Sequence, residues 1–514
     1  MGLKDNPMNR TILVRALFAG TAMMMSTAAL AQQQEAQPDT SDATADAAIA
    51  AAADVDDAQA KIELLQAQVE ALQESLAQVQ ATIVKTTPSW KGGPELADKD
   101  AGFSFKPKGF MQFDAGYVGY PNGDELRGTV GGLNYQNLGF NTRARRLVVG
   151  AEGSLPGGFK YKAEFNFAQG GVDYEDILLS YDLKDSPLTI SVGNFYPFSS
   201  LETVTSSRLG SMLERASFTD AFNYNRRLGV ALSLADKKAD RYTLSAGLFS
   251  REINDSSFTR TGWEASARGT YTPKVGSGFV HLGASAHMRT NNRESLGAQY
   301  RSRPLTQVTD QRFVDTGTVA SDGDVSVGLE LGGVMKSLHF AAEAQKLWVR
   351  GYDPDKVLTE PNDIITGNRY NNDPSFEGGY AEVGYYLTGE TRGYKGGKWD
   401  RTKVLKPFDQ GGWGAIQLNA RLDYLNLTDK VGGTVLTGGF PSGSSTAFVN
   451  GGKQLGYQLS VIWNPMDYLR FMAQYGHVDV TGGPRAATVD PDGPLDTRRK
   501  YGVDTAAVRA QLEF

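Results

Sequence analysis

Basic side chains recur on the polar face of short stretches in which apolar residues occupy every second position. In "GFKYKAEFNFA" (158–168), Phe159 and Tyr161 alternate with Lys160 and Lys162. Side chains of a β-strand point alternately to its two faces, so these lysines lie opposite the aromatic rings. A cationic group that faces water can bind an anion, and arginine suits phosphate best because its planar donor fork matches the oxygens. The basic residues with this parity are Arg146, Lys160, Lys162, Arg227, Arg268, Arg289, Arg421 and Arg470.

Two more arginines and several acids bear on this interpretation. Arg143 and Arg145 share parity with Leu147, so they join the polar face only if a β-bulge or a strand end reorients them. Carboxylates on the polar face can pair with the cations and cancel much of their field. The cations therefore either select anions or solvate a water-filled interior and brace its loops. The acids with this parity are Glu152, Glu164, Asp176, Glu330, Glu382 and Glu513.

The elements that must position these residues are amphipathic strands, which run from Gly102 to the end of the chain. "YTLSAGLF" (242–249) and "AIQLNARLDYL" (415–425) repeat the alternation, and "VRAQLEF" (508–514) ends with Phe514 on the apolar face. About a dozen such strands in a soluble sandwich would bury polar groups without partners. A closed barrel removes this conflict, because the polar face lines a water-filled lumen and the apolar face meets lipid.

The connections between strands alternate in length. Short turns such as 155–158 and 464–467 alternate with longer Gly- and Asn-rich loops such as 119–139, 196–225 and 290–323. Bacterial outer-membrane barrels show this asymmetry, with short periplasmic turns and longer external loops. The stretch from Glu390 to Gly412 is an exception, since it is long where a short turn is due. We predict an all-β fold, a transmembrane antiparallel β-barrel of about 16 strands over residues 102–514.

The N-terminus has the features of a secretory signal. "MNRTILVRALFAGTAMMMSTAALAQQQ" (8–34) combines Arg10 and Arg15 with an apolar stretch and a small-residue cleavage site that ends at Ala31. We predict a signal peptide over residues 1–31, with translation starting at Met1 or Met8. A membrane anchor fits less well, because the apolar stretch is short and ends in a processing site. Residues 32–46 are a polar low-complexity segment that we expect to be flexible.

Apolar residues then recur at alternating steps of three and four from Ala48 to Ile83. This spacing predicts a periplasmic α-helical coiled coil over residues 47–87, followed by a linker over residues 88–101. The alternative is a single amphipathic helix that packs on the barrel. The mixture of residue types in the seam predicts self-association without fixing the number of helices.

Composition argues against several other classes of protein. The chain has 52 basic and 58 acidic residues, and this net charge of -6 does not suit a nucleic-acid partner. It has no cysteine, which excludes disulfides and thiolate metal sites. Its 4 histidines are scattered, so we expect no enzyme activity, no catalytic residue, no metal and no cofactor. Asp490 and Asp492 could bind calcium in an external loop, although we favour solvated loop acids as the explanation.

Several longer motifs resemble one family. "RARRLVVGAEG" (143–153), "TSSRLGSMLERASFTDAF" (205–222) and "YYLTGETRGY" (385–394) follow in the order seen in the phosphate-selective porin O and P family. The resemblance covers nearly everything after Gly102. It implies a homotrimer of 16-stranded barrels that passes anions by diffusion, with an inward-folded third loop. That loop should follow "LTISVGNFY" (188–196), and its anion-binding candidates are Ser206, Ser207, Arg208 and Arg215.

Two functions are consistent with these features. The first is a porin in the outer membrane of a Gram-negative bacterium, surrounded by lipid and passing small anionic solutes such as phosphate. The second is an envelope tether, in which the coiled coil contacts the cell wall and the barrel acts as a general, non-selective porin. Removing residues 32–88 separates them, because conduction should survive in the first case and envelope integrity should fail in the second.

Overall fold

A computed structural model describes residues 59–76, 89–90, 94–98, 100–121, 138–250, 253, 262–291, 296–351, 367–437, 440–446, 448–484 and 500–514. The predicted signal peptide (1–31), the low-complexity segment (32–46), the two ends of the predicted coiled coil (47–58 and 77–87), Asp490 and Asp492 lie outside this part. The chain divides into two compact units, Met1–Gln80 and Ala81–Phe514, and each is treated separately below.

The described part of the first unit is a helix over residues 59–76. The apolar positions of its predicted seam are open to solvent in the single chain, with Ile62 49% and Leu72 69% exposed. No described helix is both long enough and apolar enough to cross a bilayer. The helix fits the predicted spacing, and whether it forms a coiled coil stays a prediction.

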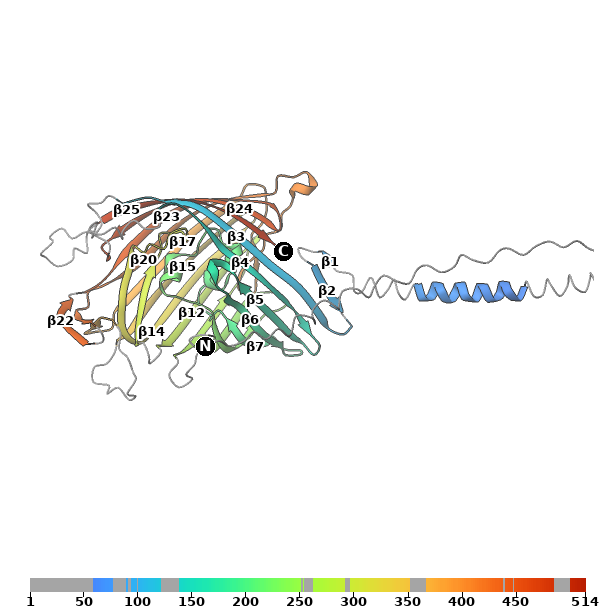
Figure 1. Cartoon of the computed structure of the whole chain (residues 1–514), viewed down its shortest axis with the longest axis horizontal. Helices are drawn as coiled ribbons and strands as arrows, with labels where there is room; N and C mark the ends of the chain where they lie inside the picture. Colours follow the sequence, from blue (N-terminus) through green and yellow to red (C-terminus); the bar gives the residue numbers. More distant parts are fainter. Residues whose placement is uncertain are drawn as a thin grey trace, which may run out of the picture. The chain divides into compact units, whose positions relative to one another are not determined.

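The second unit contains a closed antiparallel β-barrel (Figure 1). Each of its strands pairs with the next along the chain, and β25 pairs back with β3 to close the ring. The sixteen strands confirm the predicted fold and number. They are β3 (Phe103–Val118), β4 (Gly139–Leu155), β5 (Phe159–Asn166), β6 (Asp173–Asp182), β7 (Leu188–Phe195), β8 (Arg227–Ala235), β9 (Tyr242–Ser250), β10 (Trp263–Tyr271), β12 (Gly278–Thr290), β14 (Val314–Met335), β15 (Leu338–Gly351), β17 (Ser375–Tyr386), β20 (Ala415–Asp429), β23 (Val449–Met466), β24 (Leu469–Thr481) and β25 (Lys500–Glu513).

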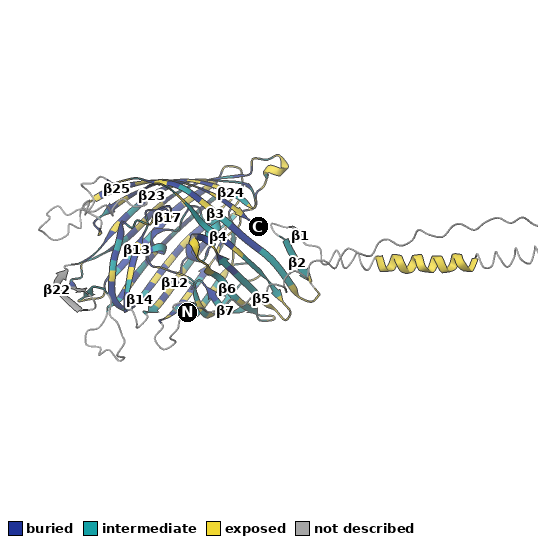
Figure 2. Ribbon diagram, in the orientation of Figure 1, coloured by how far each residue is buried: buried dark blue, intermediate teal, exposed yellow. Residues whose placement is uncertain are grey.

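Burial alternates along the strands as the two-residue period predicts. In β25 every second residue is buried and its neighbours are exposed, which Figure 2 shows as alternating colours along the barrel wall. Val508 is 54% exposed on the outer face, whereas Arg509 is 2% exposed on the inner face. From Val508 to Glu513 the buried residues are polar and the exposed ones apolar, as expected for a barrel with an apolar exterior and a polar interior. This pattern confirms the predicted orientation of the strands.

The two ends of the barrel differ in their connections. At one end, the short-turn end, β4 and β5 are joined by residues 156–158 and β23 and β24 by residues 467–468. The opposite end carries longer connections, of which the third joins β7 to β8 and contains α2 (Leu201–Val204), η3 (Ser207–Leu209) and α3 (Ser217–Ala221). At the short-turn end, residues 387–414 between β17 and β20 confirm the predicted long exception, and they contain β18 (Gly393–Lys395), β19 (Lys398–Asp400) and η4 (Phe408–Gln410).

Some segments expected to be irregular contain strands. β14 begins at Val314, inside the stretch 290–323 expected as a loop, and pairs there with β13 (Gly297–Ser302). In the segment expected as a linker, β1 (Ser89–Trp90) and β2 (Pro94–Asp98) pair with each other, and β2 pairs with β3. These strands are short or Gly-rich and depend on a pairing partner, so their sequences carry little alternating signal.

Candidate functional site

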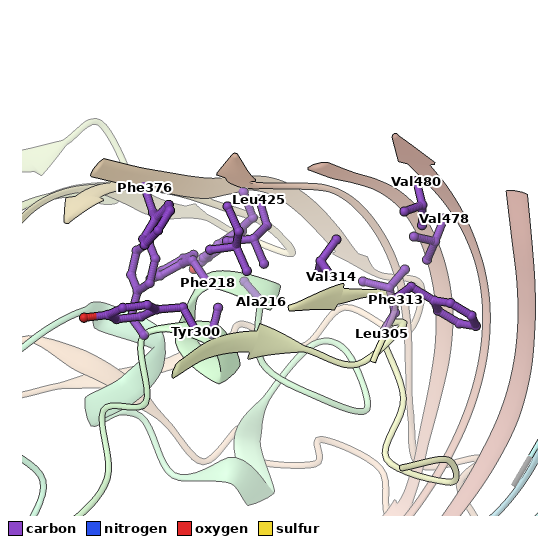
Figure 3. Close-up of a cluster of buried hydrophobic side chains, with 14 of the residues drawn as sticks. Ala216, Phe218, Tyr300, Leu305, Phe313, Val314, Phe376, Leu425, Val478 and Val480 are labelled. Atoms are coloured by element: carbon purple, nitrogen blue, oxygen red, sulfur yellow. The ribbon is translucent and has the colours of Figure 1, made fainter. Parts of the chain in front are cut away.

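The third long connection, residues 196–226, packs inside the barrel against the inner face of the opposite wall. Phe218 of α3 lies with Tyr300 of β13, Phe376 of β17 and Leu425 of β20 in a buried apolar cluster (Figure 3). Phe376, Leu425 and Phe218 are almost completely buried. Burying side chains of this size fixes the segment, because each contributes about 1.5–3 kcal/mol.

Hydrogen bonds from wall carboxylates hold the same segment. The backbone N–H groups of Leu201 and Glu202, at the start of α2, donate to the two oxygens of Glu343 on β15, each at 2.9 Å. The N–H of Ser217 donates to Asp423 of β20 at 2.9 Å. These acceptors satisfy N–H groups that the first turn of a helix leaves without partners. The segment is therefore bound to the wall at both of its helices.

Residues 387–400 reach the segment from the short-turn end. The N–H of Trp399 donates to the hydroxyl of Thr205 at 3.3 Å, and Arg392 donates to the carbonyl of Leu209 at 3.2 Å. The Arg392 guanidinium also lies 4.3 Å from the centre of the Trp399 ring, a cation–π distance. The two inward segments thus contact each other within the lumen.

A cavity of about 730 Å³ lies beside these segments and the walls of β4 to β8. Its neutral hydrogen-bonding groups include Ser206 and Ser207. Eight basic side chains and five carboxylates line it. The basic residues are Arg145, Arg146, Lys162, Arg208, Arg215, Arg226, Arg227 and Lys398, and the acids are Glu164, Asp173, Glu175, Asp176 and Asp400.

A β-bulge brings the β4 arginines to the inner face. The register between β3 and β4 shifts so that Gln112 pairs with Arg146 while Phe113 pairs with Ala144. Arg145 is the extra residue, and it donates to Glu214 at 2.9 and 3.0 Å. The bulge required to turn Arg143 and Arg145 towards the polar face is therefore present.

Most of the cavity's cations are paired with acids. Lys162 contacts Asp176 at 2.5 Å, and Arg208 lies 3.3 Å from Glu513. Burial raises the pKa of Glu214, but Arg145 and Arg509 outweigh this effect and hold that pKa well below its usual range. Arg227 is 3.6 Å from Glu264. The predicted pairing of wall acids with wall cations is thus confirmed.

Three cations at the cavity have no carboxylate within 4.0 Å among the described residues. Arg146 donates to the side-chain oxygen of Gln112 at 2.9 Å. Arg215 donates to Tyr196 at 3.0 Å and to three backbone carbonyls of its own segment. Lys398, the first residue of β19, is exposed to the cavity. None of these three forms an ion pair with a carboxylate in the part of the chain that the structure describes.

Tyr196 connects two of the arginines. Its hydroxyl accepts hydrogen bonds from Arg215 at 3.0 Å and from Arg226 at 3.2 Å. Both guanidinium groups also lie over its ring, at 5.0 and 4.2 Å from the centre. Burial raises the pKa of the phenol, but the two cations outweigh it and lower this pKa to about 8.

The remaining predicted residues lie away from the cavity. Lys160 contacts Asp182 at 2.5 Å beside a short turn, and Arg143 contacts Asp310 at 2.8 Å. The others brace the interior. Arg268 pairs with Glu330 and the carbonyl of Gly397, Arg289 with Asp324 and the carbonyl of Phe222, Arg421 with Glu202 and Glu382, and Arg470 with the carbonyls of Arg208 and Gly210.

Sequence reasoning missed Arg226, Arg392, Lys398 and Arg509 as site residues. Arg226 directly precedes β8, so strand parity did not include it. Arg392 and Lys398 lie in the unexpectedly long connection, and that exception in the loop pattern was the signal that could have identified them. Arg509 lies on the polar face of the last strand and bonds to Asp114 at 2.7 Å.

A closed barrel with an apolar exterior and a charged interior defines an outer-membrane channel protein. The family model "Phosphate-selective porin O and P" matches residues 114–514, and the chain belongs to this family.

The chain is 37% identical over 436 residues to an uncharacterised protein of Caulobacter vibrioides, covering 83% of this chain and 77% of the relative. It is 24% identical over 409 residues to porin O of Pseudomonas aeruginosa, covering 76% of this chain and 86% of the relative. Among solved structures it matches in-vitro folded OmpT of Vibrio cholerae with a TM-score of 0.44 and 10% identity, over 81% of this chain and 98% of that one.

Proposed function

We propose that this porin passes small anions, phosphate among them, through a lumen narrowed by residues 196–226. The observation that carries the proposal is that Arg146, Arg215 and Lys398 line the cavity beside that segment with no carboxylate within 4.0 Å in the described part of the chain. A pore selects an ion by replacing part of its hydration with suitable groups while binding it weakly enough for release. Guanidinium and ammonium groups without an acidic partner supply that replacement for an anion.

Different groups around the cavity have different parts in this proposal. Arg146 and Lys398 supply charge, because Arg146 uses one donor on Gln112 and Lys398 is exposed to the cavity. Arg215 supplies charge and also holds the backbone of its own segment. Ser206 and Ser207 line the same cavity and supply neutral hydroxyl donors. Arg208 contributes less net charge because Glu513 lies beside it.

Reversal potentials across a planar bilayer with a salt gradient test the proposal. We expect the native porin to prefer chloride over potassium, and we expect Arg146→Gln and Lys398→Gln each to shift the reversal potential towards cations. The matched control is Lys160→Gln, which removes one positive charge at a lumen position outside the cavity. The shifts should shrink at high salt, since the screening length falls to about 3 Å near 1 M.

Two results would contradict the proposal. One is a native channel with no preference for anions, which would make it a general porin. The other is an equal shift for Lys160→Gln and Arg146→Gln, which would assign selectivity to the overall charge of the lumen rather than to the cavity. Added phosphate should also reduce the chloride current of the native channel more than that of Arg146→Gln.

We also propose that the porin is a homotrimer whose copies associate in part through the helix over residues 59–76. The helix leaves a continuous apolar seam in the single chain, of which Leu65 is 58% and Val69 51% exposed. Such a seam is typical of helices that pack against partner helices. Fusing one helix to each barrel raises its effective concentration and favours a common oligomeric state. A tether to the cell wall is the alternative use of the same helix.

A further inference from the structure

A small loop at the short-turn end presents large apolar side chains to its surroundings. Leu405 is 57%, Phe408 56% and Trp413 77% exposed. The loop covers residues 405–414, includes η4 and appears as an exposed segment in Figure 2. Scattered exposed apolar residues are normal, but three within nine positions of one loop form a patch.

The loop is held in a defined shape. The N–H of Gly414 donates to the carbonyl of Lys406 at 2.9 Å, which closes its base, and the N–H of Gly412 donates to the carbonyl of Pro407 at 3.0 Å. Gly411 and Gly414 both adopt φ of 75°, a left-handed conformation that favours glycine. At the start of the loop, the N–H of Leu405 donates to the carboxylate of buried Glu390 at 3.2 Å. Hydrogen bonds therefore fix the loop in a conformation that leaves Leu405, Phe408 and Trp413 exposed.

The patch continues the apolar exterior of the barrel. The indole N–H of Trp463 donates to the carbonyl of Trp413 at 2.7 Å. Trp463 has the outward parity of β23, and its ring stacks on outward-facing Phe471 of β24 with centres 5.5 Å apart. The loop thus lies beside the part of the wall that meets lipid.

We propose that residues 405–414 anchor the barrel in the phospholipid leaflet at its short-turn end, with Leu405, Phe408 and Trp413 inserted at headgroup level. Tryptophan is typical of headgroup depth, and tryptophan, phenylalanine and leucine form the buried face of segments that lie in the membrane interface. Exposed Lys403 and Lys406 beside them suit lipid phosphates. The patch exposes on the order of 400 Å². A stable protein interface needs about 800 Å² from each partner, so lipid fits this surface better than a second copy.

The absence of native cysteine allows a direct test with single-cysteine variants of the full chain. Phe408→Cys carries an environment-sensitive fluorophore in phosphatidylcholine–phosphatidylglycerol nanodiscs, where both faces are accessible. Lys238→Cys, in the turn between β8 and β9, is the aqueous control, and Leu418→Cys, on the outer face of β20, is the lipid control. Each labelled protein must retain native conductance.

We expect the label at position 408 to shift to shorter wavelength, to lose intensity with shallow nitroxide lipids, and to resist an aqueous nickel quencher. The label at position 238 should show the opposite behaviour. Quenching at position 408 by nickel alone would overturn the proposal, because the loop would then lie in water. Protection from both quenchers would also overturn it, because the patch would then be covered by protein.

Discussion

At the scale of single residues, Tyr196 links pH to the charge of the cavity. Its phenol is neutral below a pKa of about 8 and negative above it, because Arg215 and Arg226 stabilise the phenolate more than burial disfavours it. Raising the pH from about 7 to about 9 therefore adds nearly one negative charge to the lining of the cavity, beside Arg215 and Arg226. We expect anion preference to fall over this range.

The measurement is the reversal potential of the native channel and of Tyr196→Phe at both pH values. Tyr196→Phe keeps the ring between the guanidinium groups but cannot ionise, so its selectivity should stay nearly constant. A pH response of equal size in both proteins would show that another group titrates.

Strand parity predicted which basic residues face the lumen but not which of them keep their charge. Arg146 and Arg268 look alike in sequence, since each is an arginine on the polar face of a strand. In the structure Arg268 forms a bidentate pair with Glu330, 62 positions away, whereas Arg146 meets the neutral Gln112. Such pairing depends on strand order, register and the path of inward segments, which no local pattern encodes.

At the scale of elements, the start of α2 should control the width of the lumen. Glu343→Gln keeps the size of the side chain but replaces one accepting oxygen by an NH₂ group, so either Leu201 or Glu202 loses its acceptor. Leaving a buried N–H without a partner costs about 1–3 kcal/mol. We expect larger and noisier single-channel currents as the segment loosens.

Glu377→Gln is the matched control for this prediction, because it makes the same chemical change on β17 at a partly exposed site facing Lys346. Currents through this control should match the native ones. If Glu343→Gln also matched them, packing of Phe218 alone would be sufficient to hold the segment.

The two faces of β5 give a second prediction at this scale. Ala163 faces outward opposite Ala151 and Ile177, and Lys162 faces the lumen beside Asp176. Arginine at position 163 should destabilise the barrel by roughly 2–4 kcal/mol if the residue lies near the bilayer midplane. Lys162→Arg keeps the inward charge and should leave the free energy of unfolding nearly unchanged. Urea unfolding in lipid vesicles measures the free energy of unfolding of both variants. An equal decrease in the two variants would contradict the assigned faces.

The barrel strands were predictable because each buries one face and exposes the other to lipid, which imposes a strict two-residue period. The third long connection and the exceptional one at 387–414 were visible as departures from the alternation of loop lengths. Their paths inside the barrel were not, because the contacts that hold them, such as Phe218 with Tyr380 and Trp399 with Thr205, join residues far apart in sequence. β13 was missed because a six-residue strand needs β14 as a partner.

At the scale of the whole molecule, the barrel closes through the chain terminus. Phe514 donates its N–H to the carbonyl of Gly109 at 3.0 Å and accepts the N–H of Gly109 at 2.9 Å. β25 pairs with β24 on one side and β3 on the other, so the sixteen-stranded sheet has no free edge within the barrel. Closure makes the barrel a conduit formed by β3 to β25, and under the proposed function the N-terminal helix acts on assembly rather than on conduction.

This separation predicts that the helix controls the oligomeric state without changing the channel. Replacing Leu65 and Leu72 by lysine puts two charges into the apolar seam, where helices could pack only by burying them. We expect less trimer at low protein concentration by native mass spectrometry, with unchanged conductance per barrel. The matched control, Ala60→Lys with Ala67→Lys, adds the same two charges on the opposite face of the helix and should keep the trimer. Removing residues 32–88 should act like the seam variant if the helix serves association. Loss of envelope integrity in cells that carry a seam variant with intact trimers would instead assign the helix to a cell-wall partner.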